Sequence, residues 1–289
     1  VVAADARSLV VHSFVKLGQR GYVVPRPHPT LVTRRVLVME RLDGFMVDDV
    51  DAMRAAGVDT HAVVRTGMVG FMEGALIEGV FHGDLHGGNL FVLPDARVAL
   101  LDFGITGRMD DAQRRAFLRL MVGAMTDDLR AQVGALRDLG ALPEDSDVDQ
   151  VISELGLAAP GIDPTQVTPE QMVAEIQRVV KLLLGYGARM PKELMLYVKN
   201  LVFLDGAIAR LAPDLDLFSE ISAISMHFAQ HHGEKLFADV AVDADDFEVD
   251  LAGVKTSFGF DPSVERLTYR ELRERRELIR SRFEKRGIA

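Results

Sequence analysis

The segment between Phe81 and Gly104 constrains the fold of this 289-residue chain more than any other part of its sequence. Two apolar runs, Leu90–Leu93 and Val98–Leu101, flank the turn Pro94–Arg97, and this order of apolar run, turn and apolar run predicts a β-hairpin. Glycine-rich polar sequence precedes the hairpin, and helical patterns dominate the rest of the chain. The fold class is therefore predicted to be α+β and predominantly helical.

The residues before this hairpin are predicted to form helices with one short strand. A first helix is expected over residues 2–17, and a proline-rich connector follows at Pro25–Pro29. Val36–Met39 is short and apolar, so it predicts a strand. A short helix is expected near residues 48–56, and a longer one over Thr60–Glu78, where apolar residues recur at helical spacing.

The chain after the hairpin is predicted to be helical. Helices are expected over about 111–126, over 128–139, from a capping box at 168–171, over 191–211 and over 264–283. Asp110 or Asp111 is placed to cap the first of them. The last helix carries more Arg and Lys than Glu, which fits either a partner- or membrane-surface helix or, as the preferred interpretation, a solvated helix with ion pairs between neighbouring turns.

Composition argues against several classes of protein. The formal net charge of -10 opposes nucleic-acid binding, which normally requires a basic face. The chain has no cysteine, so disulfides and thiolate metal sites are excluded. No run of about 18 uncharged apolar residues occurs, so no membrane span is expected. The sequence begins at Val1 without a signal-peptide pattern, and we expect it to be a fragment of a longer protein.

Three residues, Asp84, Asn89 and Asp102, form the candidate catalytic and metal-binding pattern of the sequence. Asn89 follows Asp84 by five positions and Asp102 follows Asn89 by thirteen, as in the kinase order of catalytic loop, hairpin and magnesium-binding Asp-Phe-Gly. Phosphoryl transfer requires positioning and neutralisation of phosphate charge, and Mg²⁺ prefers oxygen ligands. Asn89 and Asp102 are therefore predicted to bind Mg²⁺ and the ATP phosphates, whereas Asp84 orients the attacking hydroxyl or water.

Two histidines accompany Asp84 in this loop. His82 is predicted to be structural, holding the loop through bonds to the backbone. His86 stands two positions after Asp84, where many protein kinases place a lysine that reaches the γ-phosphate. We consider two roles for His86: a catalytic contact with the transferred phosphate or its acceptor, or support of the loop.

Two absences narrow the substrate class. Gly83 directly precedes Asp84, where protein kinases that are switched by phosphorylation carry an arginine. Only seven residues separate Asp102 from the predicted helix start at Asp110, and no Ala-Pro-Glu follows, so there is no room for a peptide-docking activation segment. A small molecule, a lipid or water is therefore the expected acceptor.

Together these motifs resemble the UbiB/aarF-domain family of atypical protein-kinase-like proteins. The resemblance rests on Val38–Gly44, His82–Asn89 and Leu101–Arg108, and the stretch Met190–Phe218 is similar to the family's helical C-terminal region. It covers roughly residues 20–235. The resemblance implies a kinase-like fold with ATP and Mg²⁺ as cofactors.

The resemblance also assigns roles. It implies that Asp84 is the catalytic-loop aspartate, that Asn89 and Asp102 are magnesium ligands, and that Glu40 and Leu42 belong to the hinge whose backbone meets adenine. It implies ATPase or phosphotransferase activity in quinone or isoprenoid-lipid metabolism, with a small-molecule or lipid substrate. The expected location is the cytoplasm, with a peripheral contact with a membrane; no nucleic-acid partner is expected, and the oligomeric state is open.

The chain is interpreted as four parts, and the resemblance bears on the first two. Residues 1–44 are interpreted as a remnant of the N-lobe, residues 45–236 as a kinase-like helical C-lobe with a short hairpin, residues 237–261 as an acidic linker and residues 262–289 as a charged helix. The N-terminal nucleotide lobe is predicted to be largely missing, because residues 1–39 contain no Glu and only one Lys, Lys16, whereas kinases pair a strand lysine with a helix glutamate. We therefore expect this chain alone to bind ATP weakly.

The loop departs from the family pattern, and two alternatives follow. Gly83, Leu85 and Gly87 replace the alanine and both prolines of the family's Ala-Asp-Pro-His-Pro-Gly-Asn. This variant also resembles small-molecule kinases of the aminoglycoside-phosphotransferase type, which is the first alternative. The second alternative is a non-catalytic scaffold with a kinase-like fold.

Overall fold

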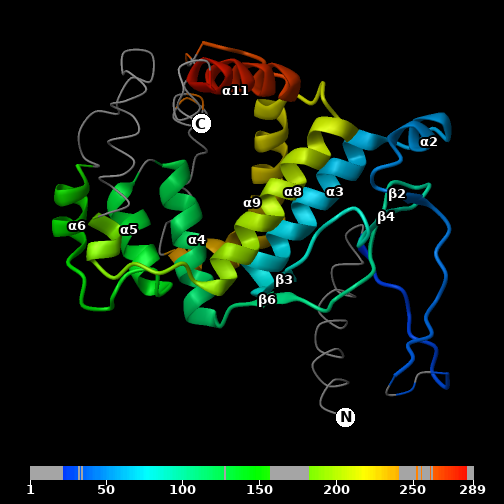
Figure 1. The fold of residues 1–289 in the computed structure, drawn as a ribbon, viewed down its shortest axis with the longest axis horizontal. Helices are drawn as coiled ribbons and strands as arrows, with labels where there is room; N and C mark the ends of the chain where they lie inside the picture. Colours follow the sequence, from blue (N-terminus) through cyan, green and yellow to red (C-terminus); the bar gives the residue numbers. More distant parts are fainter. Residues whose placement is uncertain are drawn as a thin grey trace. The chain divides into compact units, whose positions relative to one another are not determined.

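The computed structural model divides the chain into two compact units (Figure 1), the first made of Val1–Met109 and Lys192–Leu215, and the second of Asp110–Pro191 and Asp216–Ala289. The structure describes residues 22–31, 33, 35–126, 128–156, 182–240, 252, 255, 261 and 263–284. The helix predicted over residues 2–17 and the capping box predicted at 168–171 lie outside these residues. Every residue of the candidate site lies in the first unit.

The first unit contains a four-stranded sheet built on the predicted hairpin. Its strands are β1 (Tyr22–Val23), β2 (Phe45–Met46), β4 (Leu90–Val92) and β5 (Val98–Leu100), in the order β1-β5-β4-β2. β4 and β5 are antiparallel with Leu90 opposite Leu100, and β1 pairs with β5 in parallel. The hairpin prediction is confirmed; its turn contains Ala96 at a positive φ of 63°.

Two helices precede the hairpin, as predicted. α2 spans Val50–Ala55 and α3 spans Thr60–Glu73, and the Asp49 and Asp59 side chains cap their first turns. α3 continues as the π-helical segment η1 (Gly74–Glu78), so the predicted extent of the long helix is confirmed. A Cβ at Gly74 would lie 2.7 Å from the Val80 carbonyl oxygen, so the missing side chain allows the following strand to return closely against the helix.

A two-stranded sheet and a long helix complete the first unit. β3 (Val80–His82) pairs antiparallel with β6 (Thr106–Arg108), with Phe81 opposite Gly107. α8 (Lys192–Leu211) runs beside α3 (Figure 1), and Tyr197 of α8 stacks on Phe71 of α3 at a ring-centroid distance of 4.8 Å. The helix predicted over 191–211 is confirmed, whereas the three-residue strands β3 and β6 were not foreseen.

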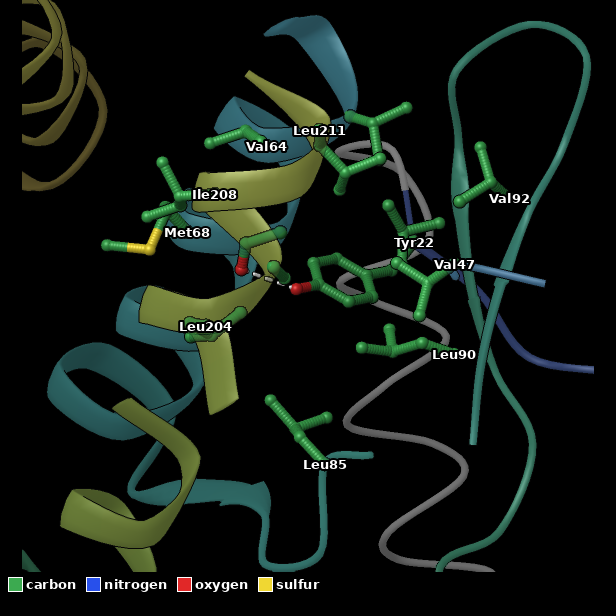
Figure 2. A pocket seen from close by; sticks show the side chains of 14 residues that line it. Tyr22, Val47, Val64, Met68, Leu85, Leu90, Val92, Leu204, Ile208 and Leu211 are labelled. Atoms are coloured by element: carbon green, nitrogen blue, oxygen red, sulfur yellow. Dashed lines mark hydrogen bonds between the residues drawn. The ribbon is translucent and has the colours of Figure 1, made fainter. Parts of the chain in front are cut away.

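The core of the first unit surrounds a small apolar cavity of about 30 Å³ (Figure 2), which is room for about one water molecule. The sheet, α3 and α8 all contribute to its lining. The Tyr22 hydroxyl donates a hydrogen bond to the Gly67 carbonyl oxygen at 2.6 Å, and burial raises the pKa of Tyr22. Leu85, the neighbour of Asp84, lines the same cavity, so the loop that carries Asp84 is anchored in the core.

The second unit is helical where the structure describes it. Its helices are α4 (Asp111–Met125), α5 (Leu129–Asp138), α6 (Val148–Leu155), α9 (Leu217–Val240) and α11 (Tyr269–Glu284). Asp110 forms a capping box with Gln113 at the start of α4, as predicted. A buried cluster of Val133, Leu142, Val151 and Leu155 packs α5 against α6. None of the helices in the described part of the chain combines the length and the apolar character that a bilayer crossing needs.

Three boundaries differ from the expectations. The strand predicted at Val36–Met39 is wrong: only an isolated bridge joins Pro27 to Met39. Val36 is 54% exposed and Leu37 48%, so this apolar run lacks the buried face that stabilises a strand. α9 continues to Val240, into the segment predicted as a linker, and α11 begins at Tyr269 rather than at 264. The predicted mixed α+β class with a small sheet is confirmed.

Candidate active site

Asp84 lies directly after β3, in a loop that leads to β4. Its side chain is 30% exposed, and its two carboxylate oxygens face different side chains. The Lys199 ammonium pairs with Oδ1, and His86 Nε2 lies 3.9 Å from Oδ2. The hydrogen bond from Lys199 lowers the pKa of Asp84, so Asp84 is an anion at neutral pH.

His82 joins the loop to the Asp-Phe-Gly segment. It is 2% exposed; its Nδ1 accepts a hydrogen bond from the Asp84 N–H at 3.1 Å, which leaves Nε2 to donate to the Asp102 carbonyl oxygen. Burial lowers the pKa of His82, which favours the neutral ring that this pair of bonds requires. The structure thus places His82 in the backbone-holding role predicted from the sequence.

Asn89 links the same two segments at the start of β4. Its Nδ2 donates to the Asp84 carbonyl oxygen at 2.9 Å, and its own carbonyl oxygen accepts from the Leu101 N–H at 3.0 Å. Asn89 is 7% exposed. The side-chain amide of Asn89 thus bonds the backbone of Asp84, and its backbone carbonyl bonds the residue before Asp102. Together with the His82 bonds, these contacts bring Asp84, Asn89 and Asp102 into one hydrogen-bonded neighbourhood.

Asp102 begins the Asp-Phe-Gly segment and is exposed to solvent. Its Oδ1 accepts a hydrogen bond from the Gly104 N–H at 2.8 Å, and among the residues that the structure describes its Oδ2 has no such bond. The ring of Phe103 packs on His82 at a centroid distance of 5.5 Å. Asp102 therefore has a fixed backbone and one carboxylate oxygen open to a ligand.

His86 bonds its own loop. Its Nδ1 accepts from the Gly88 N–H at 3.0 Å, which favours the loop-support interpretation and turns Nε2 toward Asp84. The next residue, Gly87, approaches Asp48, where a Cβ at 87 would lie 2.2 Å from Asp48 Oδ2. Arg210 holds Asp48 at 2.7 Å, so a proline at 87 would have to displace this ion pair. Gly87 stands where the family pattern has a proline, and its lack of a side chain allows this close approach to Asp48.

Two neighbouring residues of α8, Lys199 and Asn200, contact the loop and were missed by the sequence analysis. Asn200 is fully buried; its Oδ1 accepts from the Leu85 N–H at 2.9 Å, and its Nδ2 donates to the His82 carbonyl oxygen. These bonds flank Asp84 on both sides in the chain. The available signal was a polar residue on an otherwise apolar stripe, because Asn200 lies in helical register with Tyr197 and Leu204.

Glu40 and Leu42 lie outside this network. The Glu40 N–H donates to the Arg26 carbonyl oxygen at 2.8 Å, and its carboxylate lies 3.6 Å from the Arg26 guanidinium. In the described part of the chain no hydrogen bond or ion pair joins Glu40 or Leu42 to the Asp84 loop. Their assignment to an adenine-binding hinge stays a prediction.

The groups that the structure gathers suit a magnesium–phosphate ligand chemically. Asn89 offers an amide oxygen and Asp102 a carboxylate oxygen, which are the ligand types that Mg²⁺ prefers. Lys199 can balance negative charge beside Asp84, and His86 can do so only when its ring is protonated. An ionised Asp84 accepts hydrogen bonds but does not donate them, as is required of a group that orients a hydroxyl or a water molecule.

Comparison with known proteins identifies the relatives of this chain. Residues 4–135 match the ABC1 atypical kinase-like domain. An uncharacterized protein of Mycobacterium tuberculosis is 33% identical over 199 residues, which cover 68% of this chain and 41% of that protein. The probable protein kinase UbiB of Histophilus somni is 24% identical over 199 residues, covering 68% of this chain and 37% of that protein. The erythromycin complex of Rv3197 from Mycobacterium tuberculosis aligns at a TM-score of 0.35 and 16% identity, over 71% of this chain and 56% of that one.

The order of loop, hairpin and Asp-Phe-Gly agrees with the match to an atypical kinase-like domain. The match over residues 4–135 is to the ABC1 atypical kinase-like domain, and the homologues of the chain include UbiB and aarF domain-containing kinases. The resemblance inferred from the sequence motifs is therefore confirmed. The chain spans less than half the length of these curated relatives.

Proposed function

We propose that this chain carries the catalytic centre of an ATP- and Mg²⁺-dependent phosphotransferase or ATPase of the UbiB type. The observation that carries the proposal is the hydrogen-bond network of His82 and Asn89. His82 bonds the backbone of both Asp84 and Asp102, and Asn89 bonds the backbone of Asp84 and of Leu101, the residue before Asp102. A turn aspartate or a buried asparagine with a purely structural role does not require this convergence. The domain match over residues 4–135 supports the same class of reaction.

In the proposed reaction each residue has one task. Asn89 and Asp102 would hold Mg²⁺, which when bound neutralises phosphate charge. Asp84 accepts a hydrogen bond from the acceptor O–H and directs its oxygen at the γ-phosphorus of ATP. A bond forms between that oxygen and phosphorus, and the bond from phosphorus to the bridging oxygen breaks. ADP leaves with that electron pair, and the acceptor's proton passes through Asp84 to solvent.

The lowered pKa of Asp84 suits a residue that orients the acceptor by accepting a hydrogen bond from it. A weakly basic carboxylate removes a proton poorly from a neutral hydroxyl. In the loose transition state of phosphoryl transfer, however, the nucleophile needs orientation more than early deprotonation. Asp84 therefore acts mainly by aligning the acceptor, and its proton transfer comes late.

We also propose a non-protein acceptor. After Asp102 the chain enters β6 at Thr106 and then α4 at Asp111, so the intervening residues pair with β3 instead of forming a peptide-docking segment. A small molecule, a lipid or water fits this short connection. The UbiB relationship favours a quinone or isoprenoid-lipid pathway at a membrane face, whereas a kinase for small hydroxylated molecules is the alternative.

The test compares nucleotide turnover by the full-length protein and its variants. Wild-type protein should convert ATP to ADP only when Mg²⁺ is present, and Asp84→Asn and Asp102→Asn should each lower the rate by about a hundredfold or more. Asp51→Asn is the matched control, because this exposed aspartate in the first turn of α2 lies outside the site. Equal rates in all four proteins would contradict the proposal, and nucleotide binding without turnover would favour a scaffold.

A further inference from the structure

We propose that Lys199 is a further catalytic residue, which supplies from α8 the positive charge that contacts the transferred phosphate. This inference rests on the proposed function of the Asp84 site. The Lys199 ammonium pairs with Asp84 Oδ1, the carboxylate that would direct the acceptor at the phosphorus. A cation in contact with that carboxylate is within reach of the group being attacked.

Asn200 fixes the position of Lys199 relative to the loop. Its fully buried amide bonds the His82 carbonyl oxygen and the Leu85 N–H, which are backbone groups on either side of Asp84. Hydrogen bonds on both sides of one residue prevent the helix from sliding along the loop. The backbone of Lys199 is therefore held at a constant distance from Asp84, although its own side chain is flexible.

The Lys199 side chain is accessible enough to meet a ligand. It is 53% exposed, and its partner Asp84 is 30% exposed. An ion pair with this much solvent contact is weak, so the ammonium can redistribute when a more negative group arrives. An ammonium has three donors, which allows Lys199 to bond a phosphate oxygen while it keeps its bond to Asp84.

The neighbouring histidine does not fill this role as well. His86 occupies the sequence position where many protein kinases carry their phosphate-contacting lysine, but its Nδ1 is engaged by the Gly88 N–H. Its Nε2 lies 3.9 Å from Asp84 Oδ2, which is longer than a hydrogen bond. Lys199 contributes a permanent charge at the other carboxylate oxygen. The positive charge beside Asp84 therefore comes from Lys199 of α8, which lies 115 residues after Asp84 in the chain.

In the transfer step, Lys199 would bond an oxygen of the γ-phosphoryl group while the bridging bond breaks and ADP departs with its electron pair. It neither gains nor loses a proton. The charge that spreads over the phosphoryl oxygens in the transition state is stabilised by such a donor. The contact requires a γ-phosphate, so it should distinguish ATP from ADP in binding as well as in turnover.

The test uses the full-length protein with Lys199→Met, Lys199→Arg and the control Lys192→Met, which removes an exposed lysine from the first turn of the same helix. Calorimetry measures the affinity of the β,γ-imido analogue of ATP and of ADP, both with Mg²⁺. Lys199→Met should lower the preference for the triphosphate and the rate of ATP turnover by about tenfold to a hundredfold, which is the effect of losing one charged hydrogen bond. Lys199→Arg should recover part of both, and Lys192→Met should match the wild type.

Other outcomes separate this inference from the proposed function. A slower Lys199→Met variant with an unchanged triphosphate preference would show that Lys199 only positions Asp84, and unchanged kinetics would exclude any role; either overturns the inference. Wild-type protein that binds the triphosphate but turns over no ATP would overturn the proposed function, while the affinity ratio still decides the role of Lys199. Wild-type protein that binds neither nucleotide would overturn both.

Discussion

The Asp84 loop and the segment before β2 both carry motifs that resemble the family, yet the structure holds them in different ways. The loop is held by three buried polar side chains, His82, Asn89 and Asn200, each bonded to backbone. The segment 36–42 is joined to the chain by one bridge and exposed contacts, and Met39 is 41% exposed. The difference shows that this unit fixes the geometry of the loop through buried hydrogen bonds, whereas it leaves the residues of the predicted hinge at the surface.

The largest effect in this comparison should come from Asn200. Asn200→Leu removes both amide bonds and leaves the Leu85 N–H and the His82 carbonyl oxygen buried without their partner. We expect the free energy of unfolding to fall by about 2–5 kcal/mol, measured by chemical denaturation. Val202→Ala, at a 69% exposed position of the same helix, should change it by less than about 0.5 kcal/mol. Similar values for both would mean that Asn200 does not hold the loop.

Substitutions at two glycines, Gly107 and Gly134, test the packing between β3, which precedes the Asp84 loop, and β6, which follows the Asp-Phe-Gly segment. A Cβ at Gly107 would lie 2.2 Å from the Phe81 ring across the β3–β6 pair, whereas Gly134 in α5 has no atom within 4 Å of such a Cβ. Gly107→Ala should therefore lower the free energy of unfolding by about 1–3 kcal/mol. Gly134→Ala should raise it by up to about 1 kcal/mol, because alanine favours the helix. Thermal denaturation of both variants checks the prediction, and effects of the same sign would contradict it.

The neutral His82 ring predicts a pH dependence. Burial lowers the folded-state pKa of His82 below its ordinary value, so below about pH 6.5 the unfolded chain binds a proton that the folded chain resists. The free energy of unfolding should therefore fall as the pH is lowered from 7 to 5, by up to about 1.4 kcal/mol for each unit of pKa depression. His82→Gln should flatten this slope. A variant with the wild-type slope would mean that His82 is protonated in the folded chain or titrates normally.

The smallest effect is expected in the exposed segment. Leu37→Ser and Met39→Ser replace side chains that are 48% and 41% exposed, so the free energy of unfolding should change by less than about 0.5 kcal/mol for each. Chemical denaturation of the full-length protein makes the measurement. A loss above about 2 kcal/mol would show that this segment is covered in the full-length protein, and the contrast with the loop would then disappear.

The sequence predicted the local features of the site and missed the distant ones. Asp84, Asn89 and Asp102 were recognisable because they lie at a characteristic spacing within one short segment. The cap of α4 was narrowed to Asp110 or Asp111, because an aspartate just before a helical pattern can bond the first free N–H groups, and the structure has Asp110 in that place. Lys199 was not, since 115 residues separate it from Asp84 and only the packing of α8 on the loop brings them together. β3 and β6 were missed because the whole loop and hairpin lie between them, so they lack the short turn between two apolar runs that revealed β4 and β5. The strand at Val36–Met39 was wrong because its pairing with residues 26–28 stops at one bridge and its apolar side chains are not buried.

The central claim, that Asn89 and Asp102 share one metal beside a nucleotide, is tested most directly by Mn²⁺ binding. Electron paramagnetic resonance of the full-length protein, titrated with Mn²⁺ in the presence of the imido analogue of ATP, counts the bound ion. We expect Mn²⁺ binding that depends on the nucleotide in wild-type protein and in Asp51→Asn, and a large loss of it in both Asn89→Ala and Asp102→Asn. Undiminished binding in either of these two variants would contradict the account.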